Sequence, residues 1–590
     1  MRITDRQPVS LEPKELPVLS KAAPPQDWPG DLLVLGVFED CFESTDDKPS
    51  IKSEELKALD GAFDGALSEI VSLLEFKGKK GSSQVVRCGK GSAARFVGLC
   101  GLGPAEKAKP VADWGASPFQ TLGACVASAA KSVKAKSAAV ALVGATLEPA
   151  AAGRIANGVI NGGYESTRFK TKPTPSPLER VELLLGQGAA GSSAAGEVDA
   201  AVRQGVVLAR GALLTRYLVE SPPNVATPSH LADAAKRIAE AAPDVMKLEV
   251  LERDECEALG MGCYLGVAEA SDEPPKFIHL TYTPPGEVKR KVAVVGKGLT
   301  FDSGGYNIKA GAGSLIELMK FDMGGSGATL GAAQAVSQLK PEGVEVHFIV
   351  AACENMVDGK GLRPGDILVA SNGTTVEIIN TDAEGRLTLA DALLFAQKQC
   401  GAEAIVDIAT LTGACMVALG TGMAGMYASD EAMATALQAA AKAAGEKVWQ
   451  LPLVEAAELA EELKSPIADL KNLGGRYAGS ITAALFLKEF VDTDKVRGEK
   501  VWRLPLDEAV AELNKSPIAD LKNSGGRMGG SIIAALFLKE FVDTDKVSWA
   551  HIDMAGPVWN EKEGGATGFG AQLLAHWVLG QATTSSGQAA

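Results

Sequence analysis

Histidine is scarce in this chain, which has only five histidines among its 590 residues. No two of them stand at HExxH or HxH spacing; they are His230, His279, His347, His551 and His576. Histidine pairs at such spacing hold the metal in many zinc enzymes, so a zinc site of that kind is not predicted. We expect each histidine to be an ordinary core or surface residue.

Disulfide frameworks, membrane spans and a basic surface are missing as well. The nine cysteines form no CxxC pair, and their odd number in a long chain predicts reduced, buried thiols in an intracellular compartment. No apolar run reaches transmembrane length. The N-terminal MRITDRQPVSLEPKELP lacks an apolar core, so we expect neither a secretory signal nor a transit peptide in it. The formal net charge of −15 argues against nucleic-acid binding.

The sequence does contain ample material for large cores, because 46% of its residues are hydrophobic and 22% are charged. Strand-like and helix-like runs alternate along it. The strands we expect are 32–38, 94–103, 138–145, 291–298, 345–355 and 402–413, and the helices are 119–136, 198–220, 327–340 and 387–400. This alternation predicts the α/β class, with a mostly parallel central sheet flanked by helices in the larger, C-terminal part.

The length predicts more than one domain. The small-residue stretch at 186–197 is a natural boundary. We expect an N-terminal α/β domain at 1–187, a linker and connecting helix at 188–220, a larger C-terminal domain at 221–583 and a disordered tail at 584–590.

A near-perfect tandem duplication interrupts the C-terminal domain, with copies at 445–496 and 498–547. Two copies are too few for a solenoid, which needs at least three stacked units. Two explanations remain. We favour a duplicated exon or a gene-model error, and the alternative is a functional module added to the surface. We expect one copy to fill the native position in the fold and the other to lie on the surface.

The stretch NTDAEGRL places Asp382, Glu384 and Arg386 at every second position. If the stretch is extended, the three side chains point to one side. Two carboxylates at such a short separation need a cation between them. Either Arg386 or a metal ion could be that cation.

A second charged segment, VVGKGLTFDSGGYNIKAGAGSLIELMKFDMGG, begins at the end of a predicted strand and carries Lys297, Asp302, Lys309 and Asp322. Its glycines do not complete the GxGxxG pattern and no Walker lysine follows, so a nucleotide site is disfavoured. Any one of these charges alone would be an ordinary loop charge. Together they indicate a carboxylate-held metal site, and carboxylates able to bridge two ions suit a two-metal centre.

The segments KGLTFDSGGYNIK, KFDMGG and NTDAEGRLTLADAL resemble the signature segments of the leucyl aminopeptidase family, the di-metal M17 peptidases. The spelling GYNIK…SLIELMKFDMGG is most similar to the plant and algal plastid branch. The resemblance covers roughly residues 200 to 580, without one repeat copy. It implies that Lys297, Asp302, Asp322 and Glu384 hold one metal ion, and that Asp302, Asp382 and Glu384 hold the other.

The same resemblance implies the remaining roles. Lys309 would polarise the scissile carbonyl and stabilise the oxyanion, and Arg386 would bind a bicarbonate that acts as general base. The metals would be Zn²⁺ or Mn²⁺, with Mg²⁺ as a third candidate. The pocket for the N-terminal side chain would be lined by Met319, Thr410, Leu411, Gly413, Ala555 and Val558.

The function implied is that of a metal-dependent aminopeptidase, which releases leucine and other apolar N-terminal residues from peptides with a free N-terminus. The family suggests a homohexamer built as a dimer of trimers, in the cytoplasm or the chloroplast stroma. We expect neither nucleic acid nor a membrane as a partner. The alternative is a catalytically impaired structural homologue, or a chaperone-like oligomer, because the duplication falls between the charged segments and HIDMAGPVW.

Overall fold

The computed structural model describes residues 15–45, 48–172, 176–185, 193–311, 313–451, 453, 463–473, 479–488, 546–560 and 565–584. The chain forms two compact units, which divide between Leu213 and Leu214 inside helix α5 (Ser193–Glu220). The second repeat copy lies outside the described residues except for its last two positions, and the predicted tail lies outside them except for Thr584. No described helix is both long and apolar enough to span a membrane.

The smaller unit is built on a six-stranded sheet in which β5 alone is antiparallel to its neighbour. In spatial order its strands are β1 (Val18–Ala22), β8 (Arg180–Leu185), β7 (Ser137–Leu142), β2 (Gly30–Val37), β6 (Ala94–Gly101) and β5 (Ser83–Arg87). Its other elements are the hairpin of β3 (Phe42–Thr45) and β4 (Lys48–Ile51) and the helices α1 (Glu54–Ala62), α2 (Ala66–Leu73), α3 (Pro118–Val133) and α4 (Pro149–Gly162). The α3 and α4 backbones pack so closely that a Cβ on Gly158 would lie 2.0 Å from the Gln120 carbonyl oxygen.

The larger unit contains an eight-stranded mixed sheet whose four central strands run parallel. Its spatial order is β17 (Val448–Gln450), β16 (Ala424–Ala428), β20 (Ser548–Asp553), β15 (Ala404–Ala409), β11 (Arg290–Asp302), β12 (Val344–Asn355), β10 (Lys276–Tyr282) and β9 (Met246–Leu251). Strands β10 and β9 extend the sheet in antiparallel fashion on one side, and β16 pairs antiparallel with β20 on the other.

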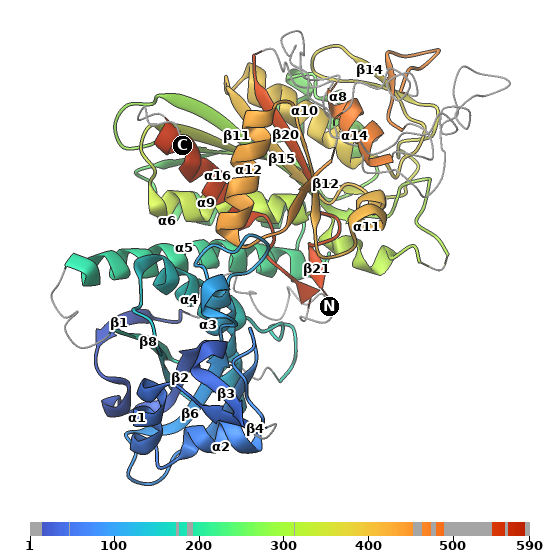
Figure 1. The fold of residues 1–590 in the computed structure, drawn as a ribbon. Helices are drawn as coiled ribbons and strands as arrows, with labels where there is room; N and C mark the ends of the chain where they lie inside the picture. Colours follow the sequence, from blue (N-terminus) through green and yellow to red (C-terminus); the bar gives the residue numbers. More distant parts are fainter. Residues whose placement is uncertain are drawn as a thin grey trace. The chain divides into compact units, whose positions relative to one another are not determined.

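Helices cover both faces of this sheet, which confirms the predicted α/β class (Figure 1). One face packs against α6 (Pro228–Ala241), α9 (Gly324–Leu339), α12 (Glu431–Ala444) and α16 (Ala571–Thr584). The other face packs against α8 (Gly262–Ala268), α10 (Gly385–Lys398) and, next to α10, α14 (Gly479–Lys488). The remaining elements of this unit are α7 (Arg253–Ala258), α11 (Gly413–Leu419) and the short pairs β13 (Ile367–Val369) with β14 (Thr375–Glu377) and β21 (Trp559–Asn560) with β22 (Gly565–Ala566).

Two predicted strands end at different residues from those expected. The strand expected at 291–298 continues to Asp302 as β11, past a register shift opposite β12 between Leu299 and Phe301. The strand expected at 402–413 ends at Ala409, and Gly413 already begins α11. In that second case Thr412 ends the extended backbone, because its hydroxyl accepts a hydrogen bond from Cys415 N and caps the helix.

The first repeat copy supplies structural elements of the larger unit. Its β17 joins the edge of the main sheet, and its β18 (Leu470–Lys471) pairs parallel with β14. Its helix α14 lies against α10. Within the described residues, the first copy therefore holds positions beside the carboxyl edge of the sheet.

Asp391 ties α10 to two neighbouring segments. Its buried carboxylate accepts hydrogen bonds from Tyr264 N at 2.9 Å and from Ser371 N at 2.8 Å. One bond fixes the start of α8, and the other fixes the turn between β13 and β14. Two backbone donors thus depend on one side chain.

We predict that Asp391→Ala destabilises the protein by about 2–5 kcal/mol, because it leaves the buried Tyr264 N–H and the partly buried Ser371 N–H without this acceptor. Urea unfolding measures the change. Asp254→Ala, at an exposed position of α7, is the matched control and should leave the free energy of unfolding nearly unchanged. Equal stability of the two variants would contradict the role of Asp391.

Candidate metal centre

Charged and polar side chains gather at the carboxyl edge of the central sheet. Lys297 and Asp302 come from β11, Asn355 ends β12, Thr410 follows β15 and Asp553 ends β20. These four strands are parallel, so their carboxyl ends meet at one edge. This group therefore lies at the edge of the sheet where the carboxyl ends of the parallel strands meet.

Lys297 lies in the buried interior of the cluster and is only 3% exposed. Its Nζ is 2.8 Å from Asp322 Oδ2 and 3.1 Å from Glu384 Oε1. It also donates to the Thr410 carbonyl oxygen at 3.2 Å. Lys297 therefore joins a carboxylate beside α9 to a carboxylate at the start of α10.

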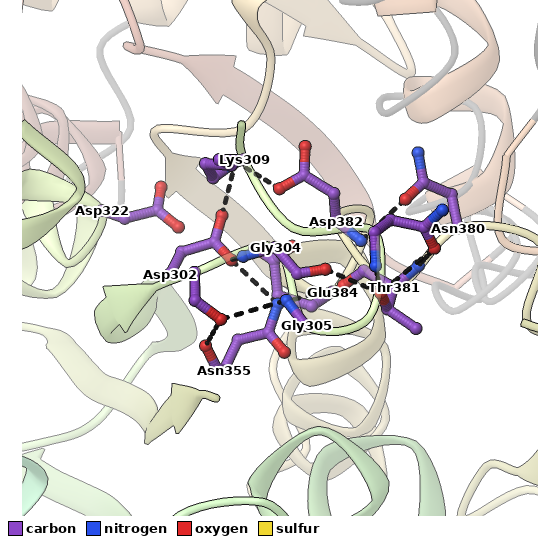
Figure 2. Close-up of polar contacts among 12 residues, drawn as sticks. Asp302, Gly304, Gly305, Lys309, Asp322, Asn355, Asn380, Thr381, Asp382 and Glu384 are labelled. Carbon is purple, nitrogen blue, oxygen red and sulfur yellow. Dashed lines mark hydrogen bonds and ion pairs between the residues drawn. The ribbon is translucent and has the colours of Figure 1, made fainter. Parts of the chain in front are cut away.

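Lys309 makes a second link between carboxylates, from the loop that follows β11 (Figure 2). Its Nζ lies 2.8 Å from Asp302 Oδ2 and forms an ion pair with Asp382 Oδ1. The loop turns at Gly304 and Gly305, where φ is +88° and +62°. A Cβ on Gly305 would also lie 2.9 Å from Thr381 Oγ1, so the paired glycines are required by both conformation and space.

Neighbouring donors fix the orientation of two of the carboxylates. Asp302 Oδ1 accepts hydrogen bonds from Asn355 Nδ2 at 2.8 Å and from Gly304 N at 2.9 Å. Asp322 Oδ1 accepts one from Thr410 Oγ1 at 2.8 Å. Each carboxylate thus has one oxygen held by the protein and the other turned toward a lysine.

The expectation that NTDAEGRL is extended was wrong. Thr381 and Asp382 lie in a turn, Glu384 has helical dihedral angles as the N-cap of α10, and Arg386 is inside that helix. Asp382 and Glu384 still reach one site, because the turn and the helix start bring them together. Asp382 N donates to Asn380 Oδ1 at 2.8 Å, a local bond that favours a turn over a strand.

Burial controls the electrostatics of the site. It raises the pKa of the carboxyls of Asp322, Asp382 and Glu384, and the nearby Asp302 raises each of them further. Burial by itself lowers the pKa of the Lys297 and Lys309 amines, but the surrounding carboxylates outweigh it and raise both. Both lysines are therefore cationic when they are the only positive charges among these carboxylates.

These residues fit divalent metal ions. Ligand oxygens of Asp302, Asp382 and Glu384 lie within 4.8 Å of one another. Glu384 Oε2 is buried and has no hydrogen-bond partner among the described residues. Four carboxyl groups (Asp302, Asp322, Asp382 and Glu384) face two ammonium groups, so the centre offers more oxygen ligands than the lysines pair with. Hard cations prefer such an oxygen-rich set.

Arg386 is buried beside the cluster, and its Nη1 donates to the Asn472 carbonyl oxygen at 2.8 Å. Burial lowers the pKa of this guanidinium, while the carboxylates of Glu384, Asp553 and Asp382 act in the opposite direction. Asn472 also holds the NTDAEGRL segment: its Oδ1 accepts from Ile379 N at 2.7 Å, and its Nδ2 donates to the Asn380 carbonyl oxygen at 2.6 Å.

Several supporting residues were missed by the sequence reasoning. Asn355, Thr381, Asn472 and Asp553 orient the site, although none bears a pattern of its own. Two of these positions had a feature that could have identified them from the sequence. Asn355 is at the end of a predicted strand, and Asn472 lies in a segment that the chain repeats.

The residues expected to line a substrate pocket lie around the same edge. Met319 belongs to a short 3-10 helix (Ile316–Phe321) just before Asp322, and Thr410 contacts Asp322 directly. Leu411 N and Ala555 N both donate to Asp553 Oδ1, at 3.3 and 3.2 Å, so their backbones meet there. Gly413 is exposed at the start of α11, and Val558 is buried.

Comparisons with known proteins find relatives along most of the chain. The family model described as "Cytosol aminopeptidase family, catalytic domain" matches residues 213–497 and 492–575, and the N-terminal domain model of the same family matches residues 34–173. The chain is 45% identical to leucine aminopeptidase 2, chloroplastic, of Oryza sativa subsp. japonica over 97% of this chain and 85% of the relative. It is 43% identical to leucine aminopeptidase 1 of Arabidopsis thaliana over 97% of each chain.

A solved structure of a related protein has a similar fold. A mutant of tomato leucine aminopeptidase superposes with a TM-score of 0.78 at 39% identity and covers 96% of both chains. The smaller unit, the larger unit and the order of the motifs therefore have counterparts in proteins of one family.

The repeat offers an internal control for the role of Asn472, because Asn523 stands at the equivalent sequence position in the second copy. We predict that Asn472→Ala weakens binding of Mn²⁺ about 10- to 100-fold, since the loop that carries Asp382 and Glu384 loses its supporting hydrogen bonds. Equilibrium dialysis measures the affinity. Asn523→Ala should bind Mn²⁺ like the unmodified chain, and a loss confined to Asn523→Ala would contradict the assignment.

Proposed function

Because the chain belongs to the cytosol aminopeptidase family and is a metal-dependent aminopeptidase, we propose that it releases leucine and other apolar residues from the N-termini of peptides. The observation that carries this proposal is the convergence of Asp302, Asp382 and Glu384 at the carboxyl edge of the sheet, with Lys297 and Lys309 between the carboxylates. Neither the comparisons nor the described residues favour the alternative of an impaired homologue.

Two divalent ions, Zn²⁺ or Mn²⁺ with Mg²⁺ as a weaker candidate, would be held by Lys297, Asp302, Asp322, Asp382 and Glu384. The buried, unpartnered Glu384 Oε2 supports this assignment. Lys297 can serve as a ligand only after losing its proton, so metal binding should release protons. When bound, the ions supply Lewis acidity that activates water and polarises a carbonyl oxygen.

Lys309 is placed to act on the substrate. Its ammonium group lies between Asp302 and Asp382, and its side chain is 15% exposed, more than the 3% of Lys297. We assign it to the scissile carbonyl oxygen, where an ammonium group stabilises negative charge that develops as the peptide bond is attacked. Arg386 would hold a bicarbonate ion that accepts a proton from the attacking water, since a buried guanidinium favours an anionic partner.

Selectivity would come from the segments around Asp553. The backbone N–H groups of Leu411 and Ala555 both donate to Asp553. Thr410 contacts Asp322, and Met319 lies three residues before Asp322 in the sequence. With Gly413, these residues would form a pocket for an apolar side chain. Such a pocket discriminates by about 1–3 kcal/mol per methylene group, so the preference for leucine should be moderate.

The assembly and the location of the protein are proposals as well. We propose a homohexamer arranged as a dimer of trimers, in the chloroplast stroma or the cytoplasm, since relatives carry both descriptions in their names. Native mass spectrometry tests the assembly, and a monomer would contradict it. We also propose that residues 188–220 connect an N-terminal domain (1–187) to the catalytic domain (221–583).

We predict that metal-stripped protein hydrolyses a leucyl chromogenic amide only after Mn²⁺ or Zn²⁺ is restored. Asp382→Ala should lower kcat/KM by about 10³-fold or more, because one metal then loses a carboxylate ligand. Lys309→Met should keep the bound metal but lose most of kcat, which separates its role from that of the ligands. Initial rates and metal analysis of the same samples give both readouts.

The matched control is Lys360→Met, which removes an exposed lysine from the β12–β13 connection and should leave the rates unchanged. Absence of hydrolysis by folded, metal-loaded protein would overturn the proposed activity. Full hydrolysis by Asp382→Ala would overturn the ligand assignment instead.

A further inference from the structure

A second group of metal-ligating side chains lies in the larger unit, apart from the catalytic centre. It consists of His279 on β10, His347 on β12 and Cys400 just beyond the C-terminal end of α10. One ligand atom from each of the three residues lies within 4.8 Å of the others. We propose that these three side chains bind a zinc ion.

The sheet brings the histidines together. In the β10–β12 ladder, His347 lies opposite Thr281, and His279 lies two residues further along the same face of β10. The two imidazoles stack with ring centroids 5.2 Å apart, and His279 Nε2 lies 3.0 Å from His347 Nδ1. Residues separated by 68 positions thus share a site that no short motif encodes.

Each imidazole has a carboxylate on its outer side. His279 Nδ1 lies 3.4 Å from Glu249 Oε2, and His347 Nε2 lies 3.2 Å from Glu345 Oε1. If each carboxylate faces an N–H, as in carboxylate–histidine–metal sites, the inner nitrogens of both neutral rings carry lone pairs. Two lone pairs 3.0 Å apart repel each other unless a cation lies beside both.

The distances suit zinc. Zinc bonds of about 2.1 Å to nitrogen and 2.3 Å to sulfur place tetrahedral N–N and N–S pairs about 3.4 and 3.6 Å apart. The His279–His347 nitrogens are separated by 3.0 Å, and Cys400 Sγ is 3.6 Å from His279 Nε2. A shift of a few tenths of an ångström at one imidazole brings the two nitrogens to the tetrahedral spacing, and the three ligand atoms all lie within 4.8 Å of one another. Thr281 Oγ1, 3.2 Å from His279 Nε2, borders the fourth position, which water would fill.

The protonation states agree with this role. Burial lowers the pKa of His279 and lowers that of His347 to about 4, so both rings are neutral ligands near neutral pH. Burial raises the pKa of the Cys400 thiol to about 12, and a bound dication reverses this by favouring the thiolate. Lys291 pairs with Glu345 at 2.9 Å and offsets part of the surrounding negative charge.

An ion can reach the site from solvent. The three ligand residues are nearly buried, with exposed fractions of 9%, 6% and 6%, but the Glu249 side chain beside them is 53% exposed. Glu249 thus lies between solvent and the histidines. A soft thiolate with two imidazoles selects zinc over Mg²⁺ or Ca²⁺, which prefer oxygen ligands.

A zinc ion at this site would link the C-terminal end of α10 to strands β10 and β12. Glu384 and Arg386 lie at the N-terminal end of this helix, and Cys400 lies two residues past its last residue, Lys398. Fourteen helical residues span about 21 Å, so the zinc would be well separated from the catalytic carboxylates. A dication there also lies near the negative end of the helix dipole.

Cobalt substitution tests the proposal, because a Co²⁺–thiolate bond gives an intense near-ultraviolet charge-transfer band and the catalytic ligands contain no sulfur. We expect the full-length, metal-stripped protein to show this band when loaded with Co²⁺. Cys400→Ser and His347→Gln should lack it and should each bind one equivalent of zinc fewer by mass-spectrometric metal analysis. In a second experiment, zinc should raise the Tm of Asp382→Ala, whose catalytic centre is impaired. Adding Cys400→Ser or His347→Gln to Asp382→Ala should abolish that rise.

Two other buried thiols provide controls. Cys256→Ser removes a thiol in α7, and Cys353→Ser removes a thiol in β12 whose pKa is raised by burial and then by the nearby Glu384. Both should retain the band. The proposal fails if unmodified protein shows no band, or if the band survives in Cys400→Ser and disappears in Cys353→Ser.

Discussion

Charge compensation among buried carboxylates is the constraint on which the rest of the larger unit depends. Asp302, Asp322 and Glu384 are each no more than 3% exposed, and among the described residues their carboxylates form ion pairs with two lysines, Lys297 and Lys309. Isolated buried charges cost several kcal/mol each, so such a cluster persists only if cations share it. Lys297 and Lys309 lie among these carboxylates, and the oxygen-rich set also suits divalent ions.

The architecture supplies the precision that this chemistry needs. Parallel strands end at one edge, where β11 contributes both Lys297 and Asp302, and helix α10 begins at the same edge with Glu384 as its N-cap. Rigid elements therefore carry most of the charged groups, while the glycine turn after β11 positions Lys309. Asn355 and Thr410 hold individual carboxylate oxygens, so that the others remain directed into the centre.

The first copy of the tandem duplication supplies elements beside this centre. The catalytic-domain model matches the chain in two overlapping ranges, 213–497 and 492–575, because one family segment is present twice. In the described residues the first copy supplies β17, β18 and α14, and its Asn472 contacts both Arg386 and the segment before Asp382. The site residues are thus supported by one copy without any ligand being displaced.

The sequence by itself determined the α/β class, the order of the main elements and the charged residues of the centre, because contiguous motifs carried most of them. It failed at NTDAEGRL, where every-second-residue spacing indicated a strand, while the local Asn380 bond and the helix start of α10 produce a turn. Only the tertiary structure decided which donors hold each carboxylate and that His279 meets His347 and Cys400. Those contacts join residues far apart in the chain, and strand pairing and helix packing, not sequence spacing, set their distances.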